Sequence, residues 1–128
     1  MSLNILIVDD DSVNRFILKK KLMLSQIHDN PLCFENGLEA LNYLTNSSFD
    51  GDIIVFLDLY MPIMNGWEFL ERIEKINLSK KIKVYVTSSS IDTFELEKVC
   101  LFNTVLNTFS KPISNQHMTL VKNELMAS

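Results

Sequence analysis

Residues 56–69 read FLDLYMPIMNGWEF, an apolar run that ends in an aspartate and continues into residues typical of turns. Asp58 closes the run, while Pro62 and the pair Asn65-Gly66 are typical of a loop that leads into a helix. A carboxylate at the end of a buried strand needs a partner, because burying an unpaired charge is costly. The stretch therefore predicts a strand, a loop and a helix that together present a functional carboxylate.

Similar apolar runs recur along the chain, and most lack the alternation of a half-exposed strand, which favours strands covered on both faces. Segments with the i, i+3, i+4 spacing of helices follow the runs. The apolar runs are residues 5–8, 32–34, 53–57, 82–86 and 105–109. This alternation of strand and helix predicts an α/β fold with a single doubly wound, five-stranded parallel sheet flanked by five helices.

The apolar spacing also predicts which side chains are buried. In the first helix an apolar stripe is expected to face the core: Val13, Phe16, Ile17, Met23, Leu24 and Ile27, interrupted by Lys20. Cys33 and Cys100 lie inside apolar segments without CxxC spacing, so we expect both to be reduced core residues.

The composition is that of one soluble globular domain of ordinary size. Of the 128 residues, 47% are hydrophobic and 22% are charged, and the net charge of −4 disfavours direct binding of nucleic acid. The sequence shows no apolar run of about eighteen residues and no signal peptide, so we expect a cytoplasmic protein that does not bind membranes.

Polar residues follow the apolar runs at the positions where an open parallel sheet binds its ligands. Residues 9–11, all aspartate, follow the first run and Asp58 follows the third. Residues 87–90, TSSS, follow the fourth run, and residues 110–112, SKP, follow the fifth. In a sheet of order 2-1-3-4-5 these four strands are neighbours, so the polar groups are expected to meet at one edge.

Several carboxylates at one edge repel each other, unless their pKa values rise or a cation binds among them. Two unit charges ~4 Å apart cost about 4 kcal/mol at an effective dielectric constant near 20. Hard oxygen ligands suit Mg²⁺, and a lysine with a threonine hydroxyl suits a phosphoryl group that the metal also contacts. The pattern predicts a nucleophilic aspartate, a divalent metal and two groups that bind a transferred phosphoryl group.

Each polar group taken alone also has a structural interpretation. The three aspartates 9–11 are expected to supply a helix cap, through Asp11 or Ser12. Residues 87–90 are compatible with a polar loop, and Lys111 with a solvated lysine beside a proline turn. Asp58 is the hardest to explain in this way, because it closes an apolar strand. The joint placement of all these groups favours the functional interpretation.

The chain resembles the receiver domain of two-component response regulators, and we expect residues 1–128 to form one such domain without an output domain. The matching segments are residues 7–11 (IVDDD), 36–41 (NGLEAL), 58–66 (DLYMPIMNG), 86–88 (VTS) and 111–112 (KP). The resemblance implies a flavodoxin-like fold and a function in phosphorelay signal transduction.

The resemblance also implies a phosphoacceptor and a metal site. Asp58 is expected to accept a phosphoryl group from a sensor histidine kinase or a histidine phosphotransfer protein. Asp10, Asp58 and the backbone carbonyl of Tyr60 are expected to bind Mg²⁺ or Mn²⁺, with Asp9 acting through the waters of the metal. The chain would then catalyse only its own phosphorylation and dephosphorylation, and switch its affinity for an unknown downstream protein through residues 92–126.

Two further residues would bind the phosphoryl group. By the resemblance, Thr87 hydrogen-bonds it and Lys111 pairs with it, and the Lys111-Pro112 peptide is expected to be cis. The chain departs from the family pattern at Thr108, where receivers usually carry an aromatic residue, and Phe109 lies on the neighbouring face. Tyr60 is a second departure, and we expect its ring to limit attack by water on the phosphorylated aspartate.

Two other functions are compatible with parts of the pattern. A phosphatase of the haloacid dehalogenase type also uses a strand-end aspartate, Mg²⁺, threonine and lysine, but needs an acidic group where Tyr60 stands. A receiver-like interaction module that is never phosphorylated would have lost an acidic residue, Thr87 or Lys111. The sequence keeps all of them, which favours phosphorylation.

Overall fold

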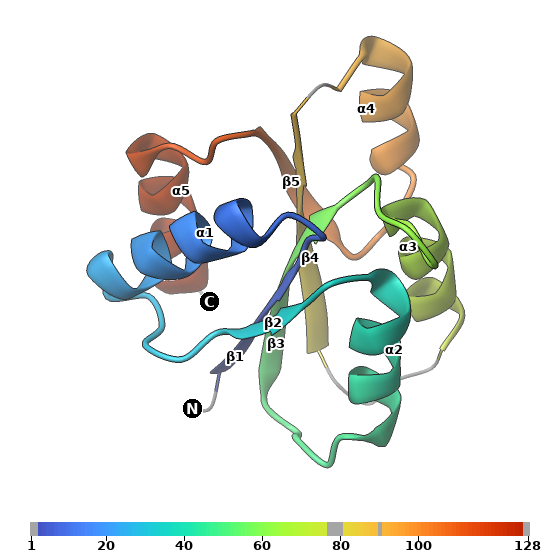
Figure 1. Cartoon of the computed structure of the whole chain (residues 1–128), viewed down its shortest axis with the longest axis horizontal. Coiled ribbons are helices and arrows are strands. Elements are labelled where there is room, and N and C mark those ends of the chain that lie inside the picture. The colour runs from blue at the N-terminus through green and yellow to red at the C-terminus, as the bar shows by residue number, and fades with distance from the viewer. Residues whose placement is uncertain (1–2, 77–80, 90, 127–128) are drawn as a thin grey trace.

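The computed structural model describes residues 3–76, 81–89 and 91–126, and shows a single sheet of five parallel strands (Figure 1). The strand order is β2-β1-β3-β4-β5, which confirms the predicted topology. The strands are β1 (Leu3–Val8), β2 (Leu32–Phe34), β3 (Asp52–Asp58), β4 (Lys81–Ser88) and β5 (Val105–Ser110). The helices are α1 (Ser12–Leu24), α2 (Gly37–Asn46), α3 (Gly66–Lys75), α4 (Thr93–Val99) and α5 (Asn115–Met126).

The helices cover both faces of the sheet, with α1 and α5 on one side and α2, α3 and α4 on the other (Figure 1). Successive residues of β3 point to opposite faces, so Ile54 and Phe56 pack with α1 and α5. Ile53, Val55 and Leu57 pack on the other face, with α2 and α3. Both faces of the central strands are therefore buried, which explains their continuous apolar sequence.

Polar side chains cap the first turns of several helices, including the cap that the sequence predicts at Asp11 or Ser12. Asp11 accepts hydrogen bonds from backbone N–H groups in the first turn of α1, and Ser114 accepts one from the N–H of His117. Asp92 and Glu95 form a reciprocal capping box at the start of α4. These bonds satisfy backbone donors that the first turn of a helix leaves unpaired, and so fix where each helix begins.

The predicted core-facing stripe of α1 is wrong. Val13, Phe16 and Leu24 are 62%, 61% and 82% exposed, whereas Leu18 and Leu22 are the buried residues of this helix. Leu18 and Leu22 are one turn apart and pack with α5 and the strands. The helix thus has two apolar sides, and most of the predicted stripe faces solvent, although Ile27, just beyond the helix, packs partly buried against the core.

The prediction that both cysteines are core residues is also wrong, since Cys33 and Cys100 are exposed free thiols. Cys33 lies on β2, an edge strand of only three residues. Cys100 follows the last residue of α4, beyond the part of that helix that packs on the sheet. Apolar neighbours in the sequence did not imply burial at either position, because Cys33 lies on an edge strand of the sheet and Cys100 lies just past the end of a helix.

Candidate functional site

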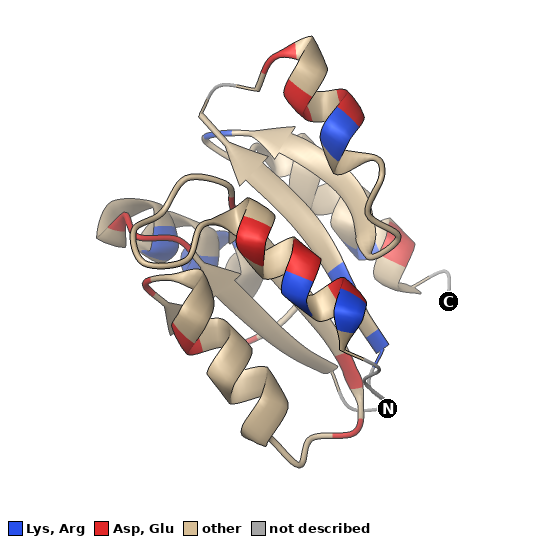
Figure 2. Ribbon diagram, turned by 90° about the vertical axis from the view of Figure 1, so that its right-hand side faces the viewer, with Lys and Arg blue, Asp and Glu red and all other residues tan. Residues whose placement is uncertain are grey.

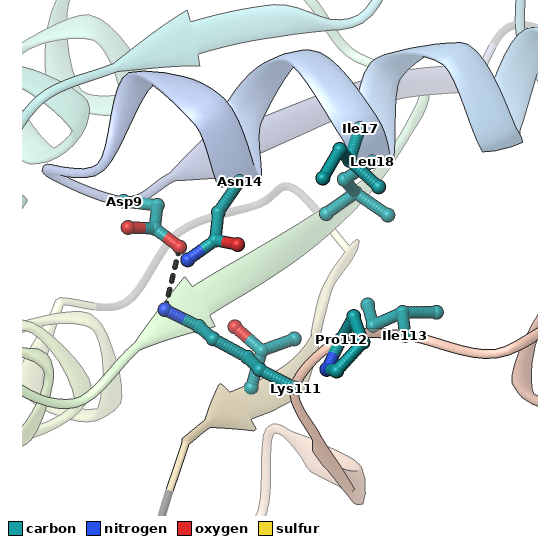
Figure 3. Close-up of a pocket in the computed structure, with 8 residues that line it drawn as sticks. Asp9, Asn14, Ile17, Leu18, Lys111, Pro112 and Ile113 are labelled. Atoms are coloured by element: carbon teal, nitrogen blue, oxygen red, sulfur yellow. Dashed lines mark ion pairs between the residues drawn. The ribbon is translucent and has the colours of Figure 1, made fainter.

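Four of the predicted site residues meet at the carboxyl edge of the sheet. Asp9 follows β1, Asp58 ends β3, Thr87 lies near the end of β4 and Lys111 follows β5. The ammonium Nζ of Lys111 lies 2.7 Å from Oδ2 of Asp9 and 3.3 Å from Oδ2 of Asp58. Figure 3 shows Lys111 reaching from the start of the α5 connection toward Asp9, beside α1.

The loop after β3 holds the backbone around Asp58 in place. The N–H of Tyr60 donates to Oδ1 of Asp58 at 3.3 Å, and the N–H of Gly66 donates to the carbonyl of Leu59 at 2.9 Å. A Cβ on Gly66 would lie 2.4 Å from the carbonyl oxygen of Asp58, so no larger residue fits there without a shift of the backbone. Ile63 has a φ of 70°, which a β-branched residue rarely adopts.

Burial sets the electrostatics of Asp58, whose side chain is only 9% exposed. Desolvation raises the pKa of Asp58 to about 6, and Lys111 opposes this rise while the charges of Asp9 and Asp10 add to it. Burial lowers the pKa of Lys111, but its bonds and charge interactions with Asp9 and Asp58 outweigh that effect and raise it. A buried carboxylate that is paired with a lysine and has a pKa near neutral is typical of a functional site.

The acidic residues can hold a divalent cation. Ligand oxygens of Asp9, Asp10 and Asp58 all lie within 4.8 Å of one another, with Asp10 exposed and the other two buried. An all-oxygen donor set with one side open to water fits Mg²⁺ or Mn²⁺. That the backbone carbonyl of Tyr60 also binds the metal stays a prediction.

Thr87 lies on β4, and Thr108 and Phe109 lie on β5. The Thr87 side chain is buried, and its hydroxyl donates to the carbonyl of Leu57 at 3.4 Å. Thr108 is half-buried. Phe109 is buried among the residues that pack with α1 and α5, and its ring centroid lies 4.5 Å from that of His117. The Lys111-Pro112 peptide is cis, as predicted.

Two residues of α1 belong to the site and were not predicted. Nη1 of Arg15 donates to the backbone carbonyl of Asp9 at 2.7 Å, and Nη2 lies 3.9 Å from a carboxylate oxygen of Glu35. Asn14 extends toward Asp9 and Lys111 in Figure 3, and lines a small pocket beside them. The sequence could have indicated both residues, because they lie in the first turn of the helix that directly follows the three aspartates.

Comparisons with known proteins agree on one family. The model of the response regulator receiver domain matches residues 5–122. The chain is 31% identical over 110 residues to the sensor histidine kinase RcsC of Salmonella typhimurium, covering 86% of this chain and 11% of that protein. It is 30% identical over 125 residues to two-component response regulator 24 of Arabidopsis thaliana, covering 96% of this chain and 84% of that protein.

Solved structures show the same fold. A two component response regulator from Cytophaga hutchinsonii superposes with a TM-score of 0.84 at 22% identity, over 98% of both chains. The chain spans only about a tenth of the length of several curated relatives, such as the 11% of RcsC. Within the described residues, none of the helices has the length and apolar character that crossing a membrane requires.

Proposed function

The chain belongs to the response regulator receiver family of two-component signalling, and we propose that it works by accepting a phosphoryl group on Asp58. One observation carries the proposal: a buried carboxylate at a strand end lies 3.3 Å from the Lys111 ammonium, beside two further aspartates. Its pKa of about 6 leaves it mostly ionised near neutral pH, and so able to act as a nucleophile.

In the proposed reaction an oxygen of Asp58 forms a bond to the phosphorus of a phosphohistidine while the phosphorus–nitrogen bond breaks. The imidazole leaves with the electron pair of that bond and takes up a proton. Lys111 would offset the negative charge on the phosphoryl oxygens, and the hydroxyl of Thr87, the strand partner of Asp58, would bond one of them after a rotation. Asp10, Asp58 and the backbone carbonyl of Tyr60 would hold Mg²⁺ or Mn²⁺, with Asp9 acting through the waters of the metal, and the ion would supply further positive charge there.

The proposed donor is a sensor histidine kinase or a histidine phosphotransfer protein. The similarity to the receiver domains of sensor histidine kinases supports this choice. We also propose that the chain catalyses only its own phosphorylation and dephosphorylation, and that α4, β5 and α5 contact the downstream protein. Phosphorylation adds charge and acceptor oxygens beside Thr87 and Lys111, which supports a readout on the strands and helices that follow them.

Acetyl phosphate with Mg²⁺ tests the proposal without a partner protein. Intact mass should rise by one phosphoryl group in the wild type, and should not rise in Asp58→Asn. Asp50→Asn is the matched control, since it removes an exposed carboxylate of the same kind and should leave the adduct unchanged. An adduct that persists in Asp58→Asn, or that forms equally with a chelator present, contradicts the proposal.

Tyr60 is proposed to control how long the phosphoryl group remains. Tyr60 is 55% exposed, and its backbone N–H is bonded to Asp58, so its side chain starts from backbone next to the phosphoacceptor. Replacing it by a small polar residue should admit water and shorten the lifetime of the aspartyl phosphate. An unchanged decay rate in Tyr60→Asn would remove this idea while leaving the phosphoacceptor assignment intact.

A further inference from the structure

A groove of about 580 Å³ lies between the loop after β3 and helix α4, next to the phosphoacceptor edge. Three aromatic residues line it, namely Tyr60, Trp67 and Phe94, together with Ser89, Asp92, Glu95 and Lys98. Phe94 is 74% exposed and Tyr60 55% exposed. Large aromatic side chains exposed together around a concave surface are typical of a binding site.

The groove already holds one cation of the protein itself. Nζ of Lys98 lies 4.5 Å from the centroid of the Trp67 ring, in the geometry of a cation–π contact. The lysine reaches across from α4 to a ring at the start of α3. The surface of the groove therefore favours positive charge, and the position of the Lys98 ammonium group over the Trp67 ring marks where a cation binds.

Two carboxylates add to this preference. Asp92 and Glu95 begin α4 and also line the groove, and Figure 2 shows acidic residues at this end of the helix. Each uses one oxygen in the capping box, Oδ1 of Asp92 and Oε1 of Glu95. The second oxygen of each can accept a bond from a ligand, because a carboxylate has room for several.

We propose that this groove binds an arginine side chain of a partner protein, which displaces Lys98 from the ring of Trp67. A guanidinium group stacks on aromatic rings and pairs with carboxylates through two parallel bonds, whereas an ammonium group does neither as well. The groove offers both kinds of contact, and its two carboxylates outnumber its one lysine. Binding at this site does not require phosphorylation. Tyr60 nevertheless links the groove to the phosphoacceptor, because it lines the groove and its backbone N–H is bonded to Asp58.

Fluorescence of Trp67 measures the binding directly, since it is the one tryptophan of the sequence. The probe is the peptide acetyl-Gly-Leu-Arg-Leu-Gly-amide, and the matched control has citrulline, a neutral analogue of the same shape, in place of arginine. Titration of the unphosphorylated protein should give a saturable change in emission with the arginine peptide. The citrulline peptide should bind at least about tenfold more weakly.

Two pairs of variants separate the site from general charge and apolar effects. Lys98→Gln should tighten binding about threefold or more, because it removes the internal competitor. Lys81→Gln, at the far end of β4, changes the net charge equally and should have little effect. Phe94→Ala should weaken binding about fivefold, and Leu24→Ala, an exposed residue of α1, should not.

Several results would overturn the proposal. Equal binding of the two peptides, or no binding of either, would show that the groove does not recognise a guanidinium group. Weaker binding in Lys98→Gln would show that Lys98 contributes to a ligand site rather than occupying it. A change in Trp67 emission on dilution without peptide would show that a second copy of the chain fills the groove. None of these outcomes depends on whether acetyl phosphate modifies Asp58.

Discussion

Replacing Asp58 by asparagine should stabilise the metal-free protein at neutral and alkaline pH. The ordinary pKa of this carboxyl group is 3.8, and burial raises it to about 6 in the folded protein. The folded state therefore disfavours ionised Asp58, and this cost is fully present above about pH 6. The cost falls as the pH drops from 6 to 3.8, and it is absent below that range, where Asp58 is protonated in both states.

The size of the effect follows from the difference between these two pKa values. A difference of about two pH units, at 1.36 kcal/mol per unit, corresponds to about 3 kcal/mol. Asparagine has the same shape and no charge to desolvate. It weakens the contact of Lys111 with position 58, but Lys111 keeps its 2.7 Å ion pair with Asp9. We therefore expect a gain of about 2–3 kcal/mol in the free energy of unfolding at pH 8.

Urea denaturation with a chelator present measures this gain. With a slope of about 1–3 kcal/mol per molar urea, the unfolding midpoint should rise by about 1 M or more at pH 8, and the two proteins should converge near pH 4. Asp50→Asn, at an exposed carboxylate, should change nothing. The reasoning is refuted if Asp58→Asn is no more stable at pH 8, or if its advantage is the same at pH 4 and pH 8.

The remaining predictions concern the contacts around the site. Lys111→Met should slow phosphorylation of Asp58 by acetyl phosphate about 100-fold, measured by intact mass against time, because a positive charge 3.3 Å from the acceptor is lost. Gly66→Ala should lower the free energy of unfolding by about 3 kcal/mol, since its Cβ would meet backbone at 2.4 Å. At Gly37 the nearest atom to an added Cβ is the carbonyl oxygen of Met64, at 2.9 Å, so Gly37→Ala should lower the free energy of unfolding by less. Urea denaturation measures both variants, and equal losses of stability would contradict this account. Ile63→Asn should raise the free energy of unfolding by about 1 kcal/mol, because asparagine tolerates a φ of 70° better than a β-branched residue does. A decrease in stability would show that the exposed side chain of Ile63 makes a stabilising contact.

Much of the fold could be predicted because the sheet imposes a simple rule on the sequence. A strand covered on both faces must be apolar at every position, as in β3, and a charged residue that ends such a strand must lie at the edge. The groups at strand ends then converge once the strand order is known. Asp9, Asp58, Thr87 and Lys111 were predicted to be neighbours by this route, and their geometry agrees.

The parts that could not be predicted depend on contacts between distant segments. Helical spacing predicted one apolar stripe in α1 and missed the side formed by Leu18 and Leu22, which packing with α5 and the strands shows to be the buried one. The contact of Lys98 with Trp67 joins residues about thirty positions apart, and neither sequence segment has a pattern that implies the other. The bond from Arg15 to the carbonyl of Asp9 joins neighbouring segments but was equally hard to predict, because its acceptor is a backbone atom that any residue would supply.

The pairing of β3 with β4 limits how the protein can respond to phosphorylation. Asp58 and Thr87 are direct partners in the parallel ladder, and neighbouring strands keep a spacing of about 4.8 Å. Their backbones have no room to approach further, so the response must come from side-chain rotation. A threonine has few χ1 minima, and within the part of the chain that the structure describes, leaving the present one breaks the 3.4 Å bond to Leu57. We therefore expect Thr87 to change in one discrete step rather than by graded displacement, which χ1-dependent scalar couplings of its methyl group would detect as two values without intermediates.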